Sequence, residues 1–333
     1  MISRKIGPFR VFPLGLGCMN LSHGYGRPAR REDSEHLLNH ALDRGVNFLD
    51  TAAIYGSGEN ERLLGQAVMH RRQEFTLASK CVLCIRDGKR VLDGRPEAIL
   101  STLEDSLRRL ATDHIDIYYL HRLDRNVPIE ESVGALARAV SEGKIGSIGL
   151  SEMSAETIRR AHSTHPISAV QSEYSAWVRN PEIAVLETCR DLSIGFVAFS
   201  PVGRGFLAGS VNSPEFEKGD IRSNMPRFNN RNIGHNLHLL ERFRAIGDEL
   251  GLSPAQLALA WVLSRGDHIV PIVGTQRIDH LDENIEAVSA RLPPEAISAA
   301  EELFSPDAVA GARYSLQAAS QIDTETFPDE HEA

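Results

Sequence analysis

The sequence contains few cysteines and no arrangement of them typical of a cross-linked or metal-binding protein. Its 333 residues include 4 cysteines, Cys18, Cys81, Cys84 and Cys189, which are too few and too scattered for a disulfide framework. Cys81 and Cys84 form one C-x-x-C pair, but no second pair with zinc spacing occurs. We therefore expect reduced thiols and no bound metal.

An excess of basic residues and long apolar runs are also absent. There are 36 Lys and Arg against 45 Asp and Glu, giving a net charge of -9, which argues against nucleic acid as a partner. No stretch reaches the roughly 18 apolar residues of a membrane helix. The start, "MISRKIGPFRVFPLG", lacks the apolar core of a signal peptide. We expect a cytoplasmic protein with no membrane contact.

The chain does contain an alternation of strand-like apolar runs and amphipathic helical stretches. Several helical stretches open on Pro or Ser and close near Gly, as capped helices do. The eight expected strands span 14–18, 46–50, 75–80, 115–120, 146–151, 168–172, 194–200 and 268–274. This alternation predicts an α/β fold, a single-domain (β/α)8 TIM barrel over residues 1–318, followed by a polar, disordered tail at 319–333.

A doubly wound nucleotide-binding sheet is the alternative fold. It would carry G-x-G-x-x-G directly after the first strand, and the sequence has no such loop there. One near match, Gly203, Gly205 and Ala208, follows the seventh expected strand and leads into a segment that breaks a helix. The barrel is therefore the better interpretation.

Polar residues or glycine stand at or near the carboxyl ends of seven expected strands. They are Asp50, Lys80, His121, Ser151, Gln171, Ser200 and Gly274. Any one of them alone would more often be a turn residue, a cap or a solvated charge. Because the carboxyl ends of barrel strands form the active site, their joint alignment indicates a functional site.

Asp50, Tyr55, Lys80 and His121 have a specific use together. A free tyrosine has a pKa near 10 and is a poor proton donor at neutral pH, so we expect the Lys80 ammonium to lower the pKa of Tyr55. Asp50 would keep Lys80 protonated, and His121 would hydrogen-bond the same oxygen. Such a tyrosine can protonate a carbonyl oxygen while a hydride reaches the carbon. Because no side chain supplies hydride, the hypothesis requires a nicotinamide cofactor.

Over nearly its whole length the sequence resembles the aldo-keto reductases. The matching segments are "GLGCM", "NFLDTAAIYGSGENERLLG", "LASK", "YYLHR", "IGLSE", "AVQSEYS", "FSPVGRGFLAG" and "PIVGTQRIDHLDENI". The resemblance implies a (β/α)8 barrel that reduces small-molecule carbonyl substrates with NADP(H), with its catalytic residues at Asp50, Tyr55, Lys80 and His121. "HRLDRNVPIEESVGAL" and "QSEYSAWVRNPE" are most similar to a bacterial and plant branch of soluble reductases.

The resemblance also implies a set of cofactor contacts. Ser151 and Gln171 correspond to residues that bind the nicotinamide carboxamide, and Phe199 stands where many members stack a tyrosine. Glu152 replaces a common Asn, and either contacts the nicotinamide or points away as a helix-capping acid. Arg277 favours NADP over NAD because a guanidinium suits a phosphate. The implied contacts are Gly17, Cys18, Met19, Asp50, Ser151, Glu152, Gln171, Phe199, Ser200, Pro201, Val202, Gly203, Arg204, Gly205, Gly274, Gln276, Arg277, His280, Glu283 and Asn284.

Other interpretations stay open. A non-catalytic, redox-sensing NADP-binding subunit of the same fold is one, and a lyase or aldolase with Lys80 as a Schiff base is another. The loops after the strands could bring Tyr25, Trp177, Phe206 or Phe228 against an apolar substrate. The sequence leaves the substrate, the favoured direction and the choice between monomer and homo-oligomer undetermined.

Overall fold

The computed structural model describes residues 2–331 and contains a closed barrel of eight strands. The barrel strands are β3 (Gly15–Gly17), β4 (Phe48–Asp50), β5 (Thr76–Cys81), β8 (Ile115–Leu120), β9 (Ile145–Ser151), β10 (Ile167–Glu173), β11 (Gly195–Phe199) and β12 (Ile269–Val273). Each strand is parallel to both neighbours, and β12 pairs with β3 to close the ring. The predicted (β/α)8 barrel is confirmed, and each expected run overlaps one barrel strand.

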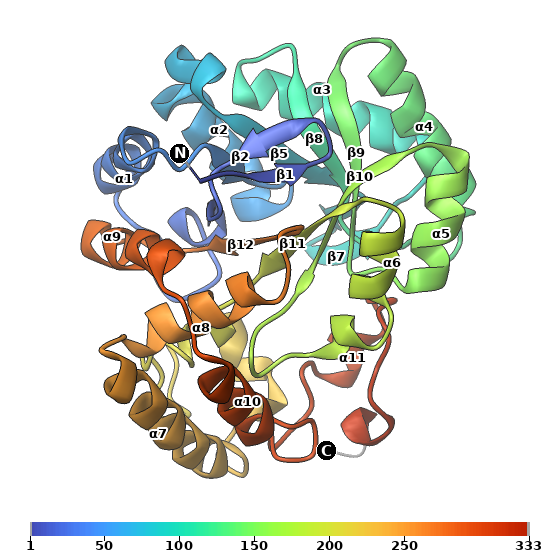
Figure 1. Cartoon of the computed structure of the whole chain (residues 1–333). Helices are drawn as coiled ribbons and strands as arrows, with labels where there is room; N and C mark the ends of the chain where they lie inside the picture. Colours follow the sequence, from blue (N-terminus) through green and yellow to red (C-terminus); the bar gives the residue numbers. More distant parts are fainter. Residues whose placement is uncertain (1, 332–333) are drawn as a thin grey trace.

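Helices surround this barrel, as Figure 1 shows. They are α1 (Arg31–Asp43), α2 (Glu59–Ala67), α3 (Pro96–Leu110), α4 (Ile129–Ser141), α5 (Ala155–Thr164), α6 (Val185–Asp191), α7 (Ile233–Leu250), α8 (Pro254–Ser264), α9 (Ile278–Glu286), α10 (Pro294–Leu303) and α11 (Leu316–Ala319). Their ends follow the sequence signals. Ser253 and Gln256 form a reciprocal capping box at the start of α8, and α7 ends at Gly251 with φ 67°. No described helix has the length and apolar character needed to cross a membrane.

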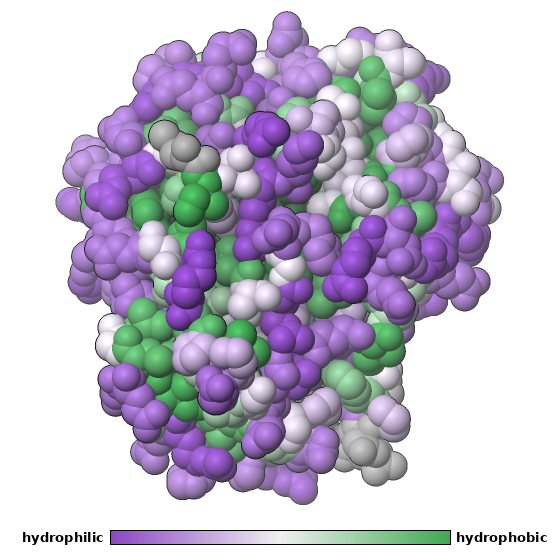
Figure 2. Space-filling model, in the orientation of Figure 1, coloured by the Kyte–Doolittle hydropathy of each residue, from purple (hydrophilic) through white to green (hydrophobic). Residues whose placement is uncertain are grey.

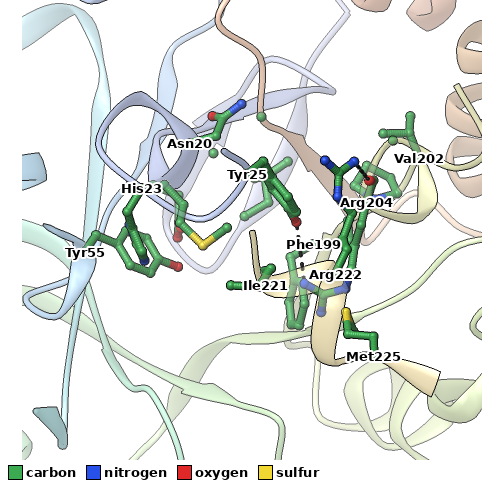
Figure 3. Close-up of a pocket in the computed structure, with 18 of the residues that line it drawn as sticks. Asn20, His23, Tyr25, Tyr55, Phe199, Val202, Arg204, Ile221, Arg222 and Met225 are labelled. Carbon is green, nitrogen blue, oxygen red and sulfur yellow. Dashed lines mark hydrogen bonds between the residues drawn. The ribbon is translucent and has the colours of Figure 1, made fainter. Parts of the chain in front are cut away.

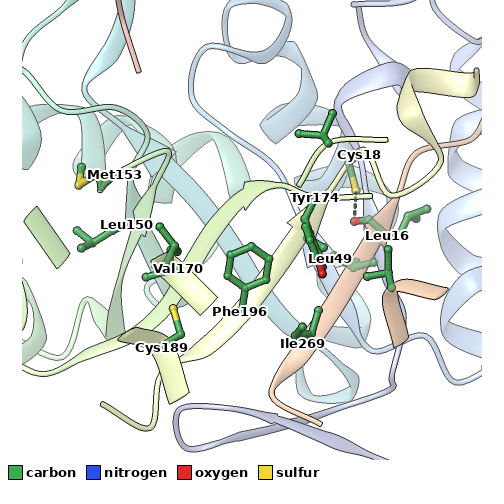
Figure 4. Packing of buried hydrophobic residues seen from close by; sticks show 14 of the residues in the cluster. Leu16, Cys18, Leu49, Leu150, Met153, Val170, Tyr174, Cys189, Phe196 and Ile269 are labelled. Carbon is green, nitrogen blue, oxygen red and sulfur yellow. Dashed lines mark hydrogen bonds between the residues drawn. The ribbon is translucent and has the colours of Figure 1, made fainter. Parts of the chain in front are cut away.

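The main hydrophobic core lies between the strands and the helices. Figure 4 shows Phe196 of β11 packed among Val170, Tyr174 and Ile269. Tyr174 and Phe196 meet edge to face, with ring centroids 5.8 Å apart. The molecular face in Figure 2 is mostly hydrophilic, interrupted by small groups of hydrophobic residues. Burial of the apolar faces of strands and helices therefore holds the barrel in shape.

Two short hairpins are added to the barrel. The first, β1 (Arg4–Ile6) and β2 (Phe9–Val11), packs its buried Ile6 and Val11 into the barrel interior. A Cβ at Gly195 would lie 2.9 Å from the Cα of Ile6, so glycine permits this close approach. The second hairpin, β6 (Leu83–Arg86) and β7 (Lys89–Leu92), follows β5 directly. Its position after a strand's carboxyl end brings Leu83 and Arg90 to the wall of a large cavity.

The C-terminal segment differs from the expected disordered tail. Asp323 accepts hydrogen bonds from the backbone N–H of Ser154 (3.1 Å) and the hydroxyl of Thr157 (2.7 Å), and Glu325 accepts one from the N–H of Ala155 (2.8 Å). Thr324 is buried. These acids satisfy free N–H groups at the start of α5, which gives this polar segment specific partners on the barrel. Residues 332 and 333 lie outside the described part of the chain.

Candidate active site

Three neighbouring strands bring the predicted proton-delivery residues together. Asp50 ends β4, Lys80 lies near the end of β5 and His121 follows β8. The ammonium of Lys80 forms an ion pair with Asp50 and donates a hydrogen bond to the carbonyl oxygen of Thr51 (2.8 Å). It lies 3.4 Å from the hydroxyl of Tyr55. The strand order β4, β5, β8 therefore explains how residues distant in sequence meet at one point.

Tyr55 is placed by a tight turn after β4. Gly56 (φ 56°), Ser57 (φ 54°) and Gly58 (φ 91°) all adopt left-handed backbone conformations. Such conformations are costly for residues other than glycine, so the two glycines of "YGSG" make this turn possible. The Tyr55 and His121 rings meet edge to face with centroids 5.8 Å apart. Figure 3 shows Tyr55 beside His23 at one side of the pocket.

The electrostatics of Tyr55 differ from expectation. Burial raises the pKa of the Tyr55 phenol above its ordinary value of 10, and the opposing effect of the Lys80 ammonium does not reverse this. For Lys80, burial would lower the pKa of the ammonium, but Asp50 and Tyr55 more than offset it and the pKa is raised. At neutral pH the phenol therefore holds its proton and Lys80 its charge, which is the state a proton donor requires.

His121 is neutral in this environment. Burial lowers the pKa of its imidazole well below 6.5, and the nearby charges of Arg122 and Lys80 act in the same direction. Its Nδ1 is buried without a hydrogen-bond partner among the described residues. His121 thus lines the cavity beside Tyr55 with one ring nitrogen that no described residue satisfies.

One cavity of about 600 Å³ is lined both by Asp50, Tyr55 and His121 and by most of the residues expected to bind a cofactor. Most of the predicted contacts line it: Gly17, Met19, Asp50, Ser151, Gln171, Phe199, Ser200, Pro201, Val202, Arg204, Gly205, Gly274, Gln276, Arg277, His280, Glu283 and Asn284. Tyr55 and His121 line it as well. The side-chain amide of Gln171 donates a hydrogen bond to the carboxylate of Asp50 (2.8 Å). This bond joins an expected nicotinamide contact to the partner of Lys80.

Three predicted cofactor contacts lie outside the cavity wall, namely Cys18, Glu152 and Gly203. Cys18 is fully buried in the core, and Gly203 is buried within the turn after β11. Glu152 accepts a hydrogen bond from the backbone N–H of Glu173 (2.8 Å) and pairs with Arg313 at 3.2 Å. Its side chain therefore points away from the cavity, as one of the two expectations had it, but it binds Arg313 and does not cap a helix, since Ser154 is the N-cap of α5.

Arg204, in the loop after β11, is fixed by a buried network. Its guanidinium forms two hydrogen bonds to Glu173 (3.0 and 2.8 Å) and one to the hydroxyl of Tyr314 (3.0 Å). Figure 3 shows it beside Tyr25, with the Arg222 side chain bonded to its carbonyl oxygen at 3.1 Å. Because Glu173 neutralises it, Arg204 acts as a rigid part of the cavity wall and not as a free cation.

Sequence reasoning missed several cavity residues. Arg122 directly follows His121 in "YYLHR", so its position beside the strand end was a usable signal. His23 and Tyr314 lie in loops and Arg90 in the short strand β7, and nothing in the sequence indicates that they face the cavity. Among the four aromatic residues considered for substrate contact, Tyr25 lines the cavity. The others pack together in the core: Trp177, Phe206 and Phe228.

Comparison with known proteins agrees with this geometry. The family model described as "Aldo/keto reductase family" matches residues 13–304. The chain belongs to the aldo/keto reductase family. It is accordingly an oxidoreductase of carbonyl compounds and their alcohols. It is 42% identical over 310 residues to "Probable aldo-keto reductase 1" of Glycine max, covering 92% of this chain and 89% of that protein. It is 41% identical to "Aldo-keto reductase yakc [NADP(+)]" of Schizosaccharomyces pombe, covering 98% of both chains.

Solved structures of aldo-keto reductases share the barrel. A glycerol dehydrogenase from Gluconobacter oxydans has a TM-score of 0.83 at 25% identity, covering 98% of each chain. The holo form of an aldo-keto reductase from Bacillus halodurans has a TM-score of 0.75 at 27% identity, covering 95% of this chain and 99% of that one. These aldo-keto reductases therefore share the fold over nearly the full length.

Proposed function

We propose that the protein reduces an aldehyde or a ketone to an alcohol with NADPH, and that Tyr55 is the proton donor. The observation that carries the proposal is that Tyr55 and His121 line one cavity, while the buried Lys80 ammonium lies 3.4 Å behind the Tyr55 hydroxyl. A bound nicotinamide would supply the hydride for the carbonyl carbon. The reaction is reversible, because the same tyrosine can accept the proton of an alcohol.

Each of the four residues has a distinct task. Tyr55 gives its proton to the carbonyl oxygen, and Lys80 stabilises the phenolate that remains. Asp50 holds Lys80 in its charged state through their buried ion pair. Neutral His121 hydrogen-bonds the same carbonyl oxygen and so orients the substrate. Burial of the group strengthens each of these electrostatic effects.

The cavity has features that suit an extended dinucleotide. Ser151, Gln171 and Phe199 would hold the nicotinamide, and the turn after β11 would face the phosphates with backbone N–H groups. The side-chain oxygen of Asn20 is buried without a partner among the described residues. A Cβ at Gly274 would lie 3.0 Å from that oxygen, so glycine keeps this wall open. We place the 2′-phosphate near Arg277, and the fission yeast relative carries NADP(+) in its name.

The state of Lys80 disfavours the Schiff-base alternative. A lysine that attacks a carbonyl needs a lowered pKa, so that its amine is neutral and free to act as the nucleophile. Lys80 instead has a raised pKa and is buried in an ion pair with Asp50. The non-catalytic alternative predicts no turnover, so a single activity screen distinguishes it from the proposal.

The test is a screen of NADPH and NADH oxidation with aldehydes, quinones, ketosteroids and sugars. We expect turnover with NADPH at a lower KM than with NADH. The exposed pair of Arg277 and Asp279 leaves the guanidinium partly neutralised and hydrated, so Arg277→Ala should raise the KM for NADPH by about threefold to tenfold. Arg30→Ala, which removes a similarly exposed arginine paired with Asp33, is the control. A strong preference for NADH in the wild type would contradict the cofactor assignment.

A further inference from the structure

The arginines of the cavity wall differ in whether the chain itself neutralises them. Five line the cavity. Three are paired with carboxylates: Arg204 with Glu173, Arg222 with Asp220, and Arg277 with Asp279. The remaining two, Arg90 and Arg122, form no ion pair with any carboxylate of residues 2–331. Arg90 is exposed to solvent and Arg122 is partly buried, so both charges stay free to bind an anion that enters the cavity.

These two arginines belong to the catalytic end of the cavity. Arg122 follows His121, donates to the carbonyl oxygen of His121 (2.6 Å) and lies 3.3 Å from the hydroxyl oxygen of Ser151. Its Nε is buried and has no partner within the described chain. Arg90 comes from β7, which brings it to the same cavity from the hairpin after β5. One arginine is therefore fixed beside the catalytic histidine, and the other comes from a separate element.

The charges around these arginines leave a positive region. The pKa of the Arg90 guanidinium is lowered to about 10 because the cavity wall partly desolvates it and Arg122 repels it, yet it remains charged at neutral pH. The cavity-lining acids are Asp50 and Glu283. Asp50 is already bound by Lys80 and Gln171, and Glu283 lies on α9 at the far end. An anion of the ligand would supply the missing counter-charge.

We propose that the natural substrate is a carbonyl compound that also carries an anionic group, a carboxylate or a phosphate, which Arg90 and Arg122 bind. The inference rests on the proposed carbonyl reduction and adds the substrate class. Guanidinium groups suit both anions because they donate paired, charge-assisted hydrogen bonds. Binding the anion here would direct the carbonyl group toward Tyr55 and His121.

The test compares an anionic and a neutral form of the same aldehyde skeleton. One pair is 4-carboxybenzaldehyde and its methyl ester, and the second is glyceraldehyde 3-phosphate and glyceraldehyde. We expect a kcat/KM for at least one anionic member at least about tenfold above that of its neutral partner, as a charge-assisted contact would give. The two pairs identify whether carboxylate or phosphate is the preferred anion. Equal kcat/KM values within both pairs would overturn the proposal while leaving carbonyl reduction intact, whereas no turnover of any aldehyde would refute the proposed function itself.

Variants separate anion binding from a structural role. Arg90→Gln and Arg122→Gln should each lower the anionic-to-neutral ratio of kcat/KM by about tenfold, and Arg90→Lys and Arg122→Lys should restore part of it. Lys89→Gln removes one charge from the same strand outside the cavity wall and should leave the ratio unchanged. An equal loss of kcat/KM for the anionic and the neutral substrate would show that the arginines support the fold. A rise in the KM for NADPH alone would show that they bind the cofactor. Either result would overturn the assignment.

Discussion

Replacement of Lys80 by methionine tests the electrostatic account most fully. The Lys80 ammonium lies 3.4 Å from the Tyr55 hydroxyl, which corresponds to about 5 kcal/mol of attraction for a phenolate at an effective dielectric constant of about 20. This is an upper bound, because the negative charge of Asp50 cancels part of the attraction. We expect a net effect of about one to two pKa units, and a decrease in kcat of about 100-fold or more as the phenolate loses its stabilising charge.

The same substitution should also lower stability. Lys80→Met leaves the carboxylate of Asp50 buried without its counter-ion, which costs about 3–5 kcal/mol of unfolding free energy. The double variant Lys80→Met/Asp50→Asn removes that uncompensated charge, so it should regain most of the stability but none of the activity. Urea unfolding and kcat as a function of pH measure the two effects. A Lys80→Met enzyme with wild-type kcat and an unchanged pH profile would refute the reasoning.

Two further predictions concern buried charges. Burial lowers the pKa of His121, so below about pH 6.5 the unfolded chain binds more protons at this residue than the folded one. The free energy of unfolding should therefore decrease as the pH is lowered from 7 to 5. His121 can contribute at most about 1.4 kcal/mol of this decrease per pH unit. His121→Asn should make the decrease shallower, and an unchanged slope in urea unfolding would contradict this. Arg313→Ala, which leaves Glu152 buried and unpaired, should cost about 3–5 kcal/mol by the same assay. Arg138→Ala, which breaks an exposed pair with Glu142, should cost under about 1 kcal/mol; equal losses would contradict the role of burial.

The barrel could be predicted from the sequence because its signals are local. Short runs rich in Val, Ile and Phe alternate with capped amphipathic stretches, and this alternation alone indicates parallel strands. The strand boundaries were predicted less accurately. A strand was expected at 14–18, whereas β3 covers only the three residues Gly15–Gly17. The polar strand ends, including Asp50 and Lys80, were predictable because a barrel collects them at one face.

Features that depend on distant residues could not be predicted. The C-terminal segment has the acidic composition of a disordered tail, but its order comes from Ser154, Ala155 and Thr157 at the start of α5. The unpaired state of Arg90 likewise follows from the three-dimensional placement of every carboxylate in the described chain. The raised pKa of Tyr55 depends on how far it is buried. No local sequence pattern indicates the contacts of the C-terminal segment, the unpaired state of Arg90 or the pKa of Tyr55.

The central claim is that Tyr55 delivers the proton, and the single-turnover rate of Tyr55→Phe with bound NADPH tests it directly. Phenylalanine keeps the ring against His121 and removes only the hydroxyl 3.4 Å from Lys80. Measuring the NADPH dissociation constant of both proteins separates loss of chemistry from loss of binding. The account predicts an unchanged dissociation constant and a reduction rate about 100-fold or more below wild type. A variant that binds NADPH and reduces its best substrate at the wild-type rate would contradict it.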